Sequence, residues 1–310
     1  MMKVGIDIGG TKCAVVLGDE GRIVKKIRFA TASYAETMKK IREAICEMGD
    51  FDAIGISCGG PLDSKRGVIL SPPNLPGWDD IHITEMLSAE FGVPAYLCND
   101  ADASALAEWR FGAGKGTENM IFLTFGTGMG AGLILNGRLY SGTNGMAGEV
   151  GHMRMADFGP VGYGKAGSFE GFCSGGGLAQ IGKMLARERL QMGESLAYCN
   201  DLSELDGITA KSLAQYASEG DETALEAYRI CGEMLGRGLA VLVDILNPER
   251  IVIGSVFARA EALLRPHMEK TLKREALSLS YQGCKIVPAA LGDSIGDYAA
   301  LAVAENHGKD

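Results

Sequence analysis

Two short glycine-rich segments of this chain have the composition of anion-binding turns. One contains Asp7, Gly9, Gly10, Thr11 and Lys12, and the other runs over 125–130 with Gly126, Thr127 and Gly128. Glycine has no side chain, so backbone amides in such turns can approach an anion closely. One turn alone is a weak signal, because ordinary hairpins also contain glycine. The pair favours an internally duplicated protein that binds one polyanion.

Two aspartates stand near the predicted ends of strands. Asp100 follows a predicted strand over Pro94–Cys98 and begins a predicted helix. A carboxylate there can take a proton from a substrate hydroxyl, but Asp is also a common helix N-cap. Asp7 offers the oxygen atoms that Mg²⁺ prefers, and a solvated strand end is the alternative. Lys12 can contact phosphate or simply be solvated.

Polar residues also gather in a loop-rich region after residue 142. Glu149 and His152 stand three positions apart, and Glu170 follows a second glycine-rich tract. Zinc sites of this kind use cysteines, and the tract Val161–Glu170 has none. Hydrogen bonding to a polyhydroxylated ligand and structural pinning of the loop both remain open for these three residues.

The segment Ser71–Trp78 contains three prolines and cannot form regular structure. Such a rigid loop can present Asn74 and Trp78 to a ligand. A plain surface connection explains the composition equally well.

The elements that must position these residues alternate between strands and helices, which predicts an α/β fold. Apolar residues at spacings of three and four predict a helix around Met38–Met48 and a long helix from Tyr228 to Ile245, ended by Asn247-Pro248. The other predicted elements are a hairpin over 3–17, strands over 23–29, 53–58, 251–253 and 285–287, and a final helix over about 297–305.

Composition limits the class of protein. The 310 residues suggest two domains, and 46% hydrophobic with 22% charged residues is typical of a globular protein. A net charge of −9 disfavours a nucleic-acid surface, and no apolar run is long enough to span a membrane. The first predicted strand leaves no room for a signal peptide, and eight scattered cysteines without a C-x-x-C pair favour reduced thiols. We therefore expect a cytoplasmic protein.

Taken together, the motifs resemble the ROK family (repressor, open reading frame, kinase) of sugar kinases. The matching segments are 7–12, 71–78, 99–103, 125–132, 148–152 and 251–254. The resemblance implies a two-lobed α/β fold of the actin-like, hexokinase-type ATPase superfamily, with duplicated ribonuclease H-like domains and an interlobe cleft. The smaller lobe would span 1–115 and the larger lobe 116–290, with a C-terminal helix at about 291–310 packing back on the smaller one.

The resemblance also implies residue roles. Asp100 would be the general base, and Asp7 would hold Mg²⁺ through water. Phosphate or nucleotide contacts would come from Gly9, Gly10, Thr11, Lys12, Gly126, Thr127, Gly128 and Gly254, the last facing adenosine. Sugar contacts would come from Gly60, Asn74, Asn99, Glu149, His152 and Glu170.

The chain departs from the family pattern at one place. Many members carry three cysteines after the histidine, and these bind structural zinc together with it. The corresponding positions here are Val161, Tyr163 and Ser168. We expect no zinc, and we expect packing around Tyr163 and Phe169 to order the loop.

The implied activity is ATP-dependent phosphorylation of a hexose or N-acetylhexosamine, of a glucokinase-like or N-acetylmannosamine/N-acetylglucosamine kinase-like type, giving a 6-phosphate. The expected partners are the sugar, ATP and Mg²⁺, with no nucleic acid, no membrane and a possible homodimer. Family repressors have an N-terminal helix-turn-helix, which this sequence does not show before its first motif. The alternatives are a catalytically silent sugar sensor with the same fold and a chaperone-like or actin-like ATPase. The sequence names neither the sugar nor a donor other than ATP, such as polyphosphate.

Overall fold

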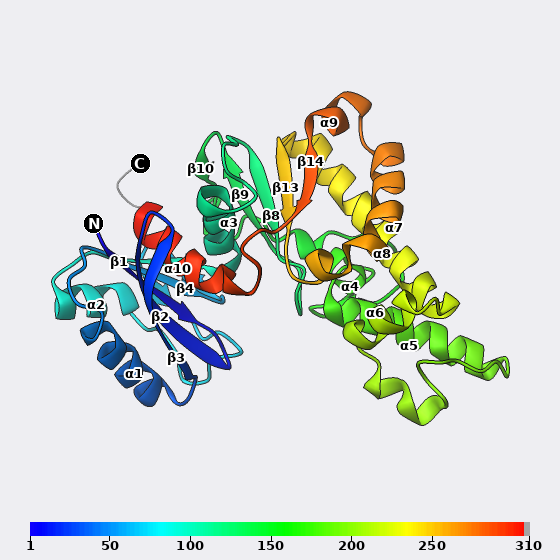
Figure 1. Ribbon diagram of the computed structural model, residues 1–310, viewed down its shortest axis with the longest axis horizontal. Helices are drawn as coiled ribbons and strands as arrows, with labels where there is room; N and C mark the ends of the chain where they lie inside the picture. Colours follow the sequence, from blue (N-terminus) through cyan, green and yellow to red (C-terminus); the bar gives the residue numbers. More distant parts are fainter. Residues whose placement is uncertain (307–310) are drawn as a thin grey trace. The chain divides into compact units, whose positions relative to one another are not determined.

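The computed structural model describes residues 1–306, which form two compact units (Figure 1). Unit 1 contains Met1–Phe122, Gly132–Ala147 and the chain from Ala290 onward, and unit 2 contains Leu123–Ala131 and Gly148–Ala289. The lobe limits expected from the sequence, 1–115 and 116–290, stay a prediction.

The first sheet has the strand order β3-β2-β1-β4-β7. Its strands are β1 (Lys3–Ile8), β2 (Lys12–Asp19), β3 (Arg22–Ala30), β4 (Ile54–Cys58) and β7 (Ala95–Asn99). The first three strands are antiparallel, while β4 and β7 run parallel to β1. Ser57 therefore lies opposite Asp7, and Cys58 lies opposite Asn99. This register brings the carboxyl ends of β1, β4 and β7 to one edge of the sheet.

Helices cover this sheet within unit 1. They are α1 (Tyr34–Cys46), α2 (Ile83–Phe91), α3 (Asp100–Phe111) and α10 (Ile295–Asn306), with the short strands β5 (Leu62–Asp63) and β6 (Val68–Ile69) between α1 and α2. Met38, Ile41 and Ile45 of α1 are buried in the core, as their spacing predicts. Ser33 caps this helix by accepting a hydrogen bond from the Glu36 amide.

The C-terminal helix α10 packs directly on β1 and β4 (Figure 1). The approach is close because both strands carry glycine at the contact. A Cβ on Gly5 would lie 2.8 Å from the Leu301 amide nitrogen, and a Cβ on Gly55 would lie 2.2 Å from the Ala300 carbonyl oxygen. The alanine-rich helix α10 lies against the glycines of β1 and β4, so the backbones of helix and strands are in direct contact.

The buried carboxylate of Glu108 fixes the chain that leads into α10. It accepts hydrogen bonds from the amides of Ala113 (2.7 Å), Ala290 (3.2 Å) and Leu291 (2.9 Å). Three donors compensate for the removal of this charge from water.

The second sheet has the order β10-β9-β8-β13-β14. Its strands are β8 (Met120–Leu123), β9 (Ala131–Leu135), β10 (Arg138–Leu139), β13 (Arg250–Ile253) and β14 (Lys285–Pro288). The order matches that of the first sheet position by position, with β9 and β10 antiparallel and β13 and β14 parallel. The predicted α/β fold with internal duplication is confirmed.

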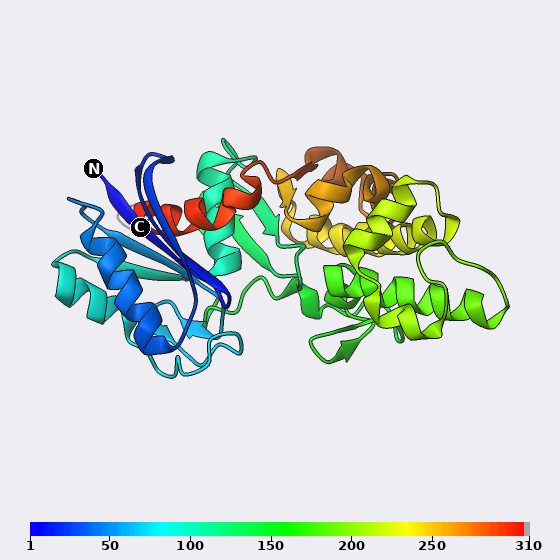
Figure 2. The same cartoon turned by 60° about the horizontal axis from the view of Figure 1, so that its bottom comes forward.

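Most of unit 2 is helical. Its elements are α4 (Phe169–Phe172), α5 (Gly175–Gln191), α6 (Ala210–Ser218), α7 (Glu222–Leu246), α8 (Val256–Glu275), α9 (Ser278–Gly283) and the two-strand hairpin β11 (Val161–Gly162) and β12 (Lys165–Ala166). Short 3-10 turns lie at Val150–His152, Leu202–Gly207 and Gly292–Ser294, the last in unit 1. Helix α7 runs along α8 (Figure 2). The predicted end of α7 is confirmed, because Asn247 is a left-handed C-cap with φ 43°.

Two further properties concern membrane spans and thiols. Among residues 1–306, no helix has both the length and the apolar character that crossing a bilayer requires. The cysteines, all within this range, are free thiols, and only Cys46 is exposed.

Candidate active site

Asn99 and Asp100 lie at the carboxyl edge of the first sheet, where β7 passes into α3. Asn99 is the N-cap of α3, because its Oδ1 accepts from the Ala101 amide at 3.0 Å. Asp100 is the first helical residue and is exposed, and its Oδ1 lies 2.9 Å from the same amide. The interpretation of Asp100 as the helix cap is therefore wrong. Asn99 takes that role, and Asp100 is an exposed residue of the first helical turn whose Oδ1 also accepts from the Ala101 amide.

The glycines after β4 lie against this pair. A Cβ on Gly60 would lie 3.4 Å from the Asn99 Nδ2, and a Cβ on Gly59 would lie 3.8 Å from the Asp100 Oδ2. Gly60 and Asn99, both predicted to contact sugar, are thus neighbours. The open backbone at Gly59 and Gly60 leaves room beside the two polar side chains.

The carboxyl of Asp7 lies in the same unit, and its surroundings disfavour its charged form. Burial raises its pKa to about 6, and the carboxylates of Asp297 and Asp100 act in the same direction, against Lys12 and Lys26. A divalent cation would relieve this crowding of negative charge. The donor set fits Mg²⁺, which often takes one carboxylate together with phosphate oxygens and water.

Two residues near Asp7 were not predicted from the sequence. Gly296, in the first turn of α10, is so close that a Cβ there would lie 2.5 Å from the Asp7 Oδ2. Its neighbour Asp297 is buried and paired with Lys26 of β3. The only local signal is a Gly-Asp pair at the start of a helix, which is too common to indicate a site.

The first glycine turn joins β1 to β2. The Gly9 amide donates to the Lys12 carbonyl at 3.1 Å, and the Thr31 hydroxyl donates to the Gly9 carbonyl at 2.6 Å. Thr11 and Lys12 are exposed. Asn74 lies against this turn, since a Cβ on Gly10 would lie 2.8 Å from the Asn74 Cβ.

The proline-rich loop exposes one of the two side chains that it could offer to a ligand. Asn74 is exposed, but Trp78 is 0% exposed and packs edge-on against Tyr34 with ring centroids 5.2 Å apart. The structure rules out a ligand-facing Trp78, one of the two alternatives for this loop, because its ring is part of the core of unit 1.

The second glycine turn joins β8 to β9. The Gly126 amide donates to the Gly128 carbonyl at 3.1 Å, and Thr127 is exposed. Gly254, buried at the end of β13, donates to the Leu123 carbonyl at 3.0 Å. This bond joins Gly254, the residue expected to face adenosine, to the end of β8, from which the turn begins.

Two helices begin at this second turn. The Gly175 amide at the start of α5 donates to the Gly126 carbonyl at 2.8 Å, and the Val256 amide at the start of α8 donates to the Phe125 carbonyl at 2.8 Å. Both helices point their positive N-terminal ends at the turn, which favours an anion there. This role of α5 was not predicted from the sequence, although its first residues Gly175–Gly177 are glycines.

Glu170 connects the second turn to the loop that carries His152. Its Oε2 accepts from the Met129 amide at 3.0 Å, and a Cβ on Gly128 would lie 2.7 Å from the same oxygen. A Cβ on Gly151 would lie 2.2 Å from the Met129 carbonyl oxygen. Unit 2 thus brings the 148–152 loop, Glu170 and the glycine turn together, with Glu149 and His152 exposed.

Comparison with known proteins gives the family. The model of the ROK family matches residues 3–307. This chain belongs to the ROK family. It is 32% identical over 302 residues to the glucokinase of Streptomyces coelicolor, covering 95% of each chain.

Two further relatives are a solved enzyme and a regulator. The chain is 31% identical to a ROK family glucokinase from Streptomyces griseus, solved with glucose and AMPPNP, with a TM-score of 0.77 and coverage of 98% and 99%. It is also 27% identical over 304 residues to the xylose repressor of Caldicellulosiruptor bescii, covering 94% of this chain but 74% of the repressor.

The loop that carries zinc ligands in many ROK members is ordered here by packing and hydrogen bonds. Phe169 is buried against Gly238, as expected for this aromatic residue. The expectation for Tyr163 is wrong, because this residue is 82% exposed and contacts the edge of the His152 ring, at 5.4 Å between centroids. Its position at the tip of the β11–β12 hairpin keeps it out of the core.

The donor set of this loop does not fit zinc. Val161, Tyr163 and Ser168 provide no thiolate, and the described part of the chain places no three His, Cys, Asp or Glu side chains together as metal ligands. That this ROK protein contains no zinc remains a prediction.

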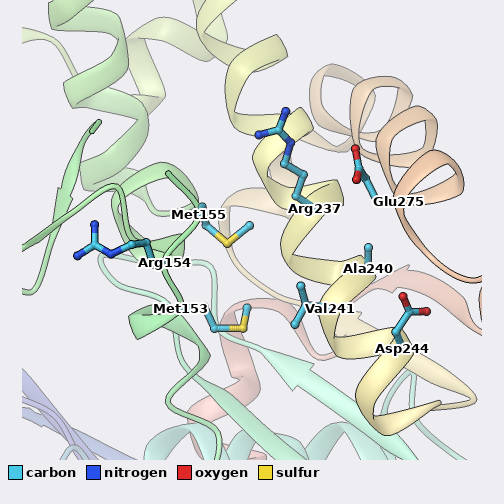
Figure 3. A pocket seen from close by; sticks show the side chains of 8 residues that line it. All are labelled: Met153, Arg154, Met155, Arg237, Ala240, Val241, Asp244 and Glu275. Carbon is cyan, nitrogen blue, oxygen red and sulfur yellow. The ribbon is translucent and has the colours of Figure 1, made fainter. Parts of the chain in front are cut away.

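A cavity of about 480 Å³ lies in unit 2 beside the segment that follows His152 (Figure 3). It is lined by Met153, Arg154, Met155, Arg237, Ala240, Val241, Asp244 and Glu275. Figure 3 shows Met153 on the side of Val241, while Arg154 points away from α7. None of the predicted site residues lines this cavity.

Proposed function

We propose that this ROK protein is an ATP-dependent kinase of a hexose or N-acetylhexosamine, with a glucokinase-like specificity as the first choice. The observation that carries the proposal is the match to glucokinases along the whole chain, one of them solved with glucose and AMPPNP. The exposed Asp100 beside open glycine backbone supports the same function.

The nucleotide phosphates would bind the two glycine turns. Gly9, Gly10, Thr11 and Lys12 form the first phosphate segment, and Gly126, Thr127 and Gly128 form the second, with Gly254 toward adenosine. The N-termini of α5 and α8 add favourable dipoles at the second turn. Bound Mg²⁺ neutralises charge on the transferred phosphate, and Asp7 would hold it through water.

Asp100 would act as the general base. It accepts the proton of a primary sugar hydroxyl, at C6, while that oxygen attacks the γ-phosphorus and ADP leaves. Gly60, Asn74, Asn99, Glu149, His152 and Glu170 would bind the other hydroxyls. The bond from the Met129 amide orients the Glu170 carboxylate for this task. A homodimer and a cytoplasmic location complete the proposal.

One relative favours a second candidate, a sugar sensor without transfer activity. The xylose repressor shares most of this chain's length. Asp7, Asp100 and both glycine turns are present here, and these favour the enzyme.

A coupled ADP-release assay tests the proposal. MgATP would be offered with hexoses, N-acetylhexosamines and β-glucosides, with and without a zinc-selective chelator. A separate assay of the sugar phosphate product would test polyphosphate as the donor. Turnover of one sugar that the chelator does not change supports the kinase. Sugar binding in a thermal-shift assay without turnover would support the sensor instead.

A further inference from the structure

The side chain of Gln180 ties the β11–β12 hairpin to α5. The Val161 amide donates to the Gln180 Oε1 at 2.9 Å, and the Gln180 Nε2 donates to the Val161 carbonyl at 2.9 Å. The side-chain amide thus pairs with Val161 as a backbone peptide would, using one donor and one acceptor. Two bonds in opposite directions fix both the position and the orientation of β11 on the helix.

The position of β11 matters because it packs against Glu170. A Cβ on Gly162 would lie 2.6 Å from the Gly171 amide nitrogen and 2.8 Å from the Glu170 Cβ. The strand therefore walls one side of the Glu170 side chain, and the Met129 amide holds its other end. A displaced β11 would remove this wall and leave the carboxylate less firmly held.

The second strand of the hairpin reaches His152. The Lys165 Nζ donates to the His152 carbonyl at 2.5 Å, and the Arg154 Nη1 donates to the Ala166 carbonyl at 3.2 Å. Figure 3 shows Arg154 pointing away from α7, and its bond to Ala166 links the 153–155 segment to β12. His152 and Glu170 are thus both positioned by this one hairpin.

We infer that Gln180 is a positioning residue for sugar binding: its two bonds to Val161 hold the hairpin that sets the positions of Glu170 and His152. The inference rests on the proposed function for the role of those two side chains. The hydrogen bonds of the Gln180 side chain go to Val161 and, at 3.4 Å, to the Gly176 carbonyl, and not to Glu170 or His152.

The test replaces Gln180 by Met, which has a similar length and neither donor nor acceptor. The matched control is Gln215→Met on α6, where the side-chain amide donates to Glu219 at the end of the same helix, at 3.1 Å. We expect Gln180→Met to raise the sugar KM by roughly 5- to 30-fold, since two solvent-accessible hydrogen bonds are lost. The kcat at saturating sugar and the KM for MgATP should stay within about two-fold of wild type, as should all constants of the control.

Hydrogen exchange of residues 159–171 gives a readout that needs no activity. Exchange should become faster in Gln180→Met and stay unchanged in Gln215→Met. Unchanged exchange in Gln180→Met overturns the inference. Faster exchange with an unchanged sugar KM also overturns it, as does an equal rise in the KM for sugar and the KM for MgATP. A wild-type chain that turns over no sugar defeats the proposed function instead, and exchange together with calorimetric sugar binding then decides whether Gln180 acts as inferred.

Discussion

At the scale of single residues, the surroundings of the Asp7 carboxyl in the folded chain make its ionisation unfavourable. Burial, Asp297 and Asp100 raise its pKa to about 6, from an ordinary value of 3.8. Below pH 3.8 the carboxyl is protonated in both folded and unfolded chains. The folded chain binds this proton more tightly than the unfolded chain does, which stabilises the folded state at low pH. As the pH rises through 6, the folded chain also loses the proton, and this stabilisation is lost. Under the proposed function, the folded chain bears this cost at Asp7 until Mg²⁺ binds.

Replacement of Asp7 by Asn should therefore stabilise the free protein at neutral pH. We expect a gain of about 1–2 kcal/mol at about pH 7.5, below the limit of roughly 3 kcal/mol set by the pKa shift, and almost none at about pH 4. Urea unfolding of both proteins in a metal-free buffer would measure the difference. A gain that does not change with pH would contradict this explanation.

The role proposed for Asp100 also belongs to the residue scale. Asp100→Asn keeps the shape of the side chain but removes the proton acceptor, so kcat should fall by ~10²–10⁴-fold while sugar binding persists. Steady-state kinetics and calorimetry measure the two effects. The exposed Asp50→Asn serves as the control, and near-normal turnover of Asp100→Asn would show that another group is the base.

At the scale of elements, the contact between α10 and the first sheet depends on glycine. Gly55 of β4 faces the backbone of α10 so closely that a Cβ on it would lie 2.2 Å from the Ala300 carbonyl oxygen. Because backbone atoms cannot rotate away as a side chain does, a methyl group there must separate the helix from the strand. The start of the same helix carries Gly296, which lies against Asp7.

Gly55→Ala should therefore lower the free energy of unfolding by about 3 kcal/mol, the upper range for overpacking. Chemical denaturation measures it. Gly283→Ala is the matched control, since nothing lies within 4 Å of a Cβ there and its φ is not in the left-handed region. Equal stability of the two variants would mean that α10 tolerates a wider separation than the contact indicates.

At the scale of the whole molecule, the same strand order occurs in both sheets, and each sheet provides one glycine turn. The family match extends over residues 3–307, which include both glycine turns and the 153–170 loop. Hydrogen bonds from Gln180, Arg154 and Lys165 hold this loop.

The purified protein should accordingly contain far less than one zinc ion per chain, because thiolate ligands are missing from the loop. Elemental analysis measures the content, and a zinc-selective chelator should leave the unfolding temperature unchanged. Stoichiometric zinc, lost together with stability on chelation, would contradict the prediction.

The sequence by itself determined several of the elements and the class of the fold. Apolar spacing predicted α1, α7 and the buried strands, Asn247-Pro248 predicted the end of α7, and two glycine turns predicted the duplication that the sheets confirm. These signals are local, since each depends on residues within a few positions of one another.

Only the tertiary structure decided which residues meet. Trp78 is in the core instead of facing a ligand, Asn99 caps α3 in place of Asp100, and Tyr163 is exposed. Lys26 pairs with Asp297 across 271 positions of chain, and Gln180 pairs with Val161 on another element. A local pattern reports period and turn chemistry but not the partner, because contacts between distant residues depend on how the sheets and helices pack.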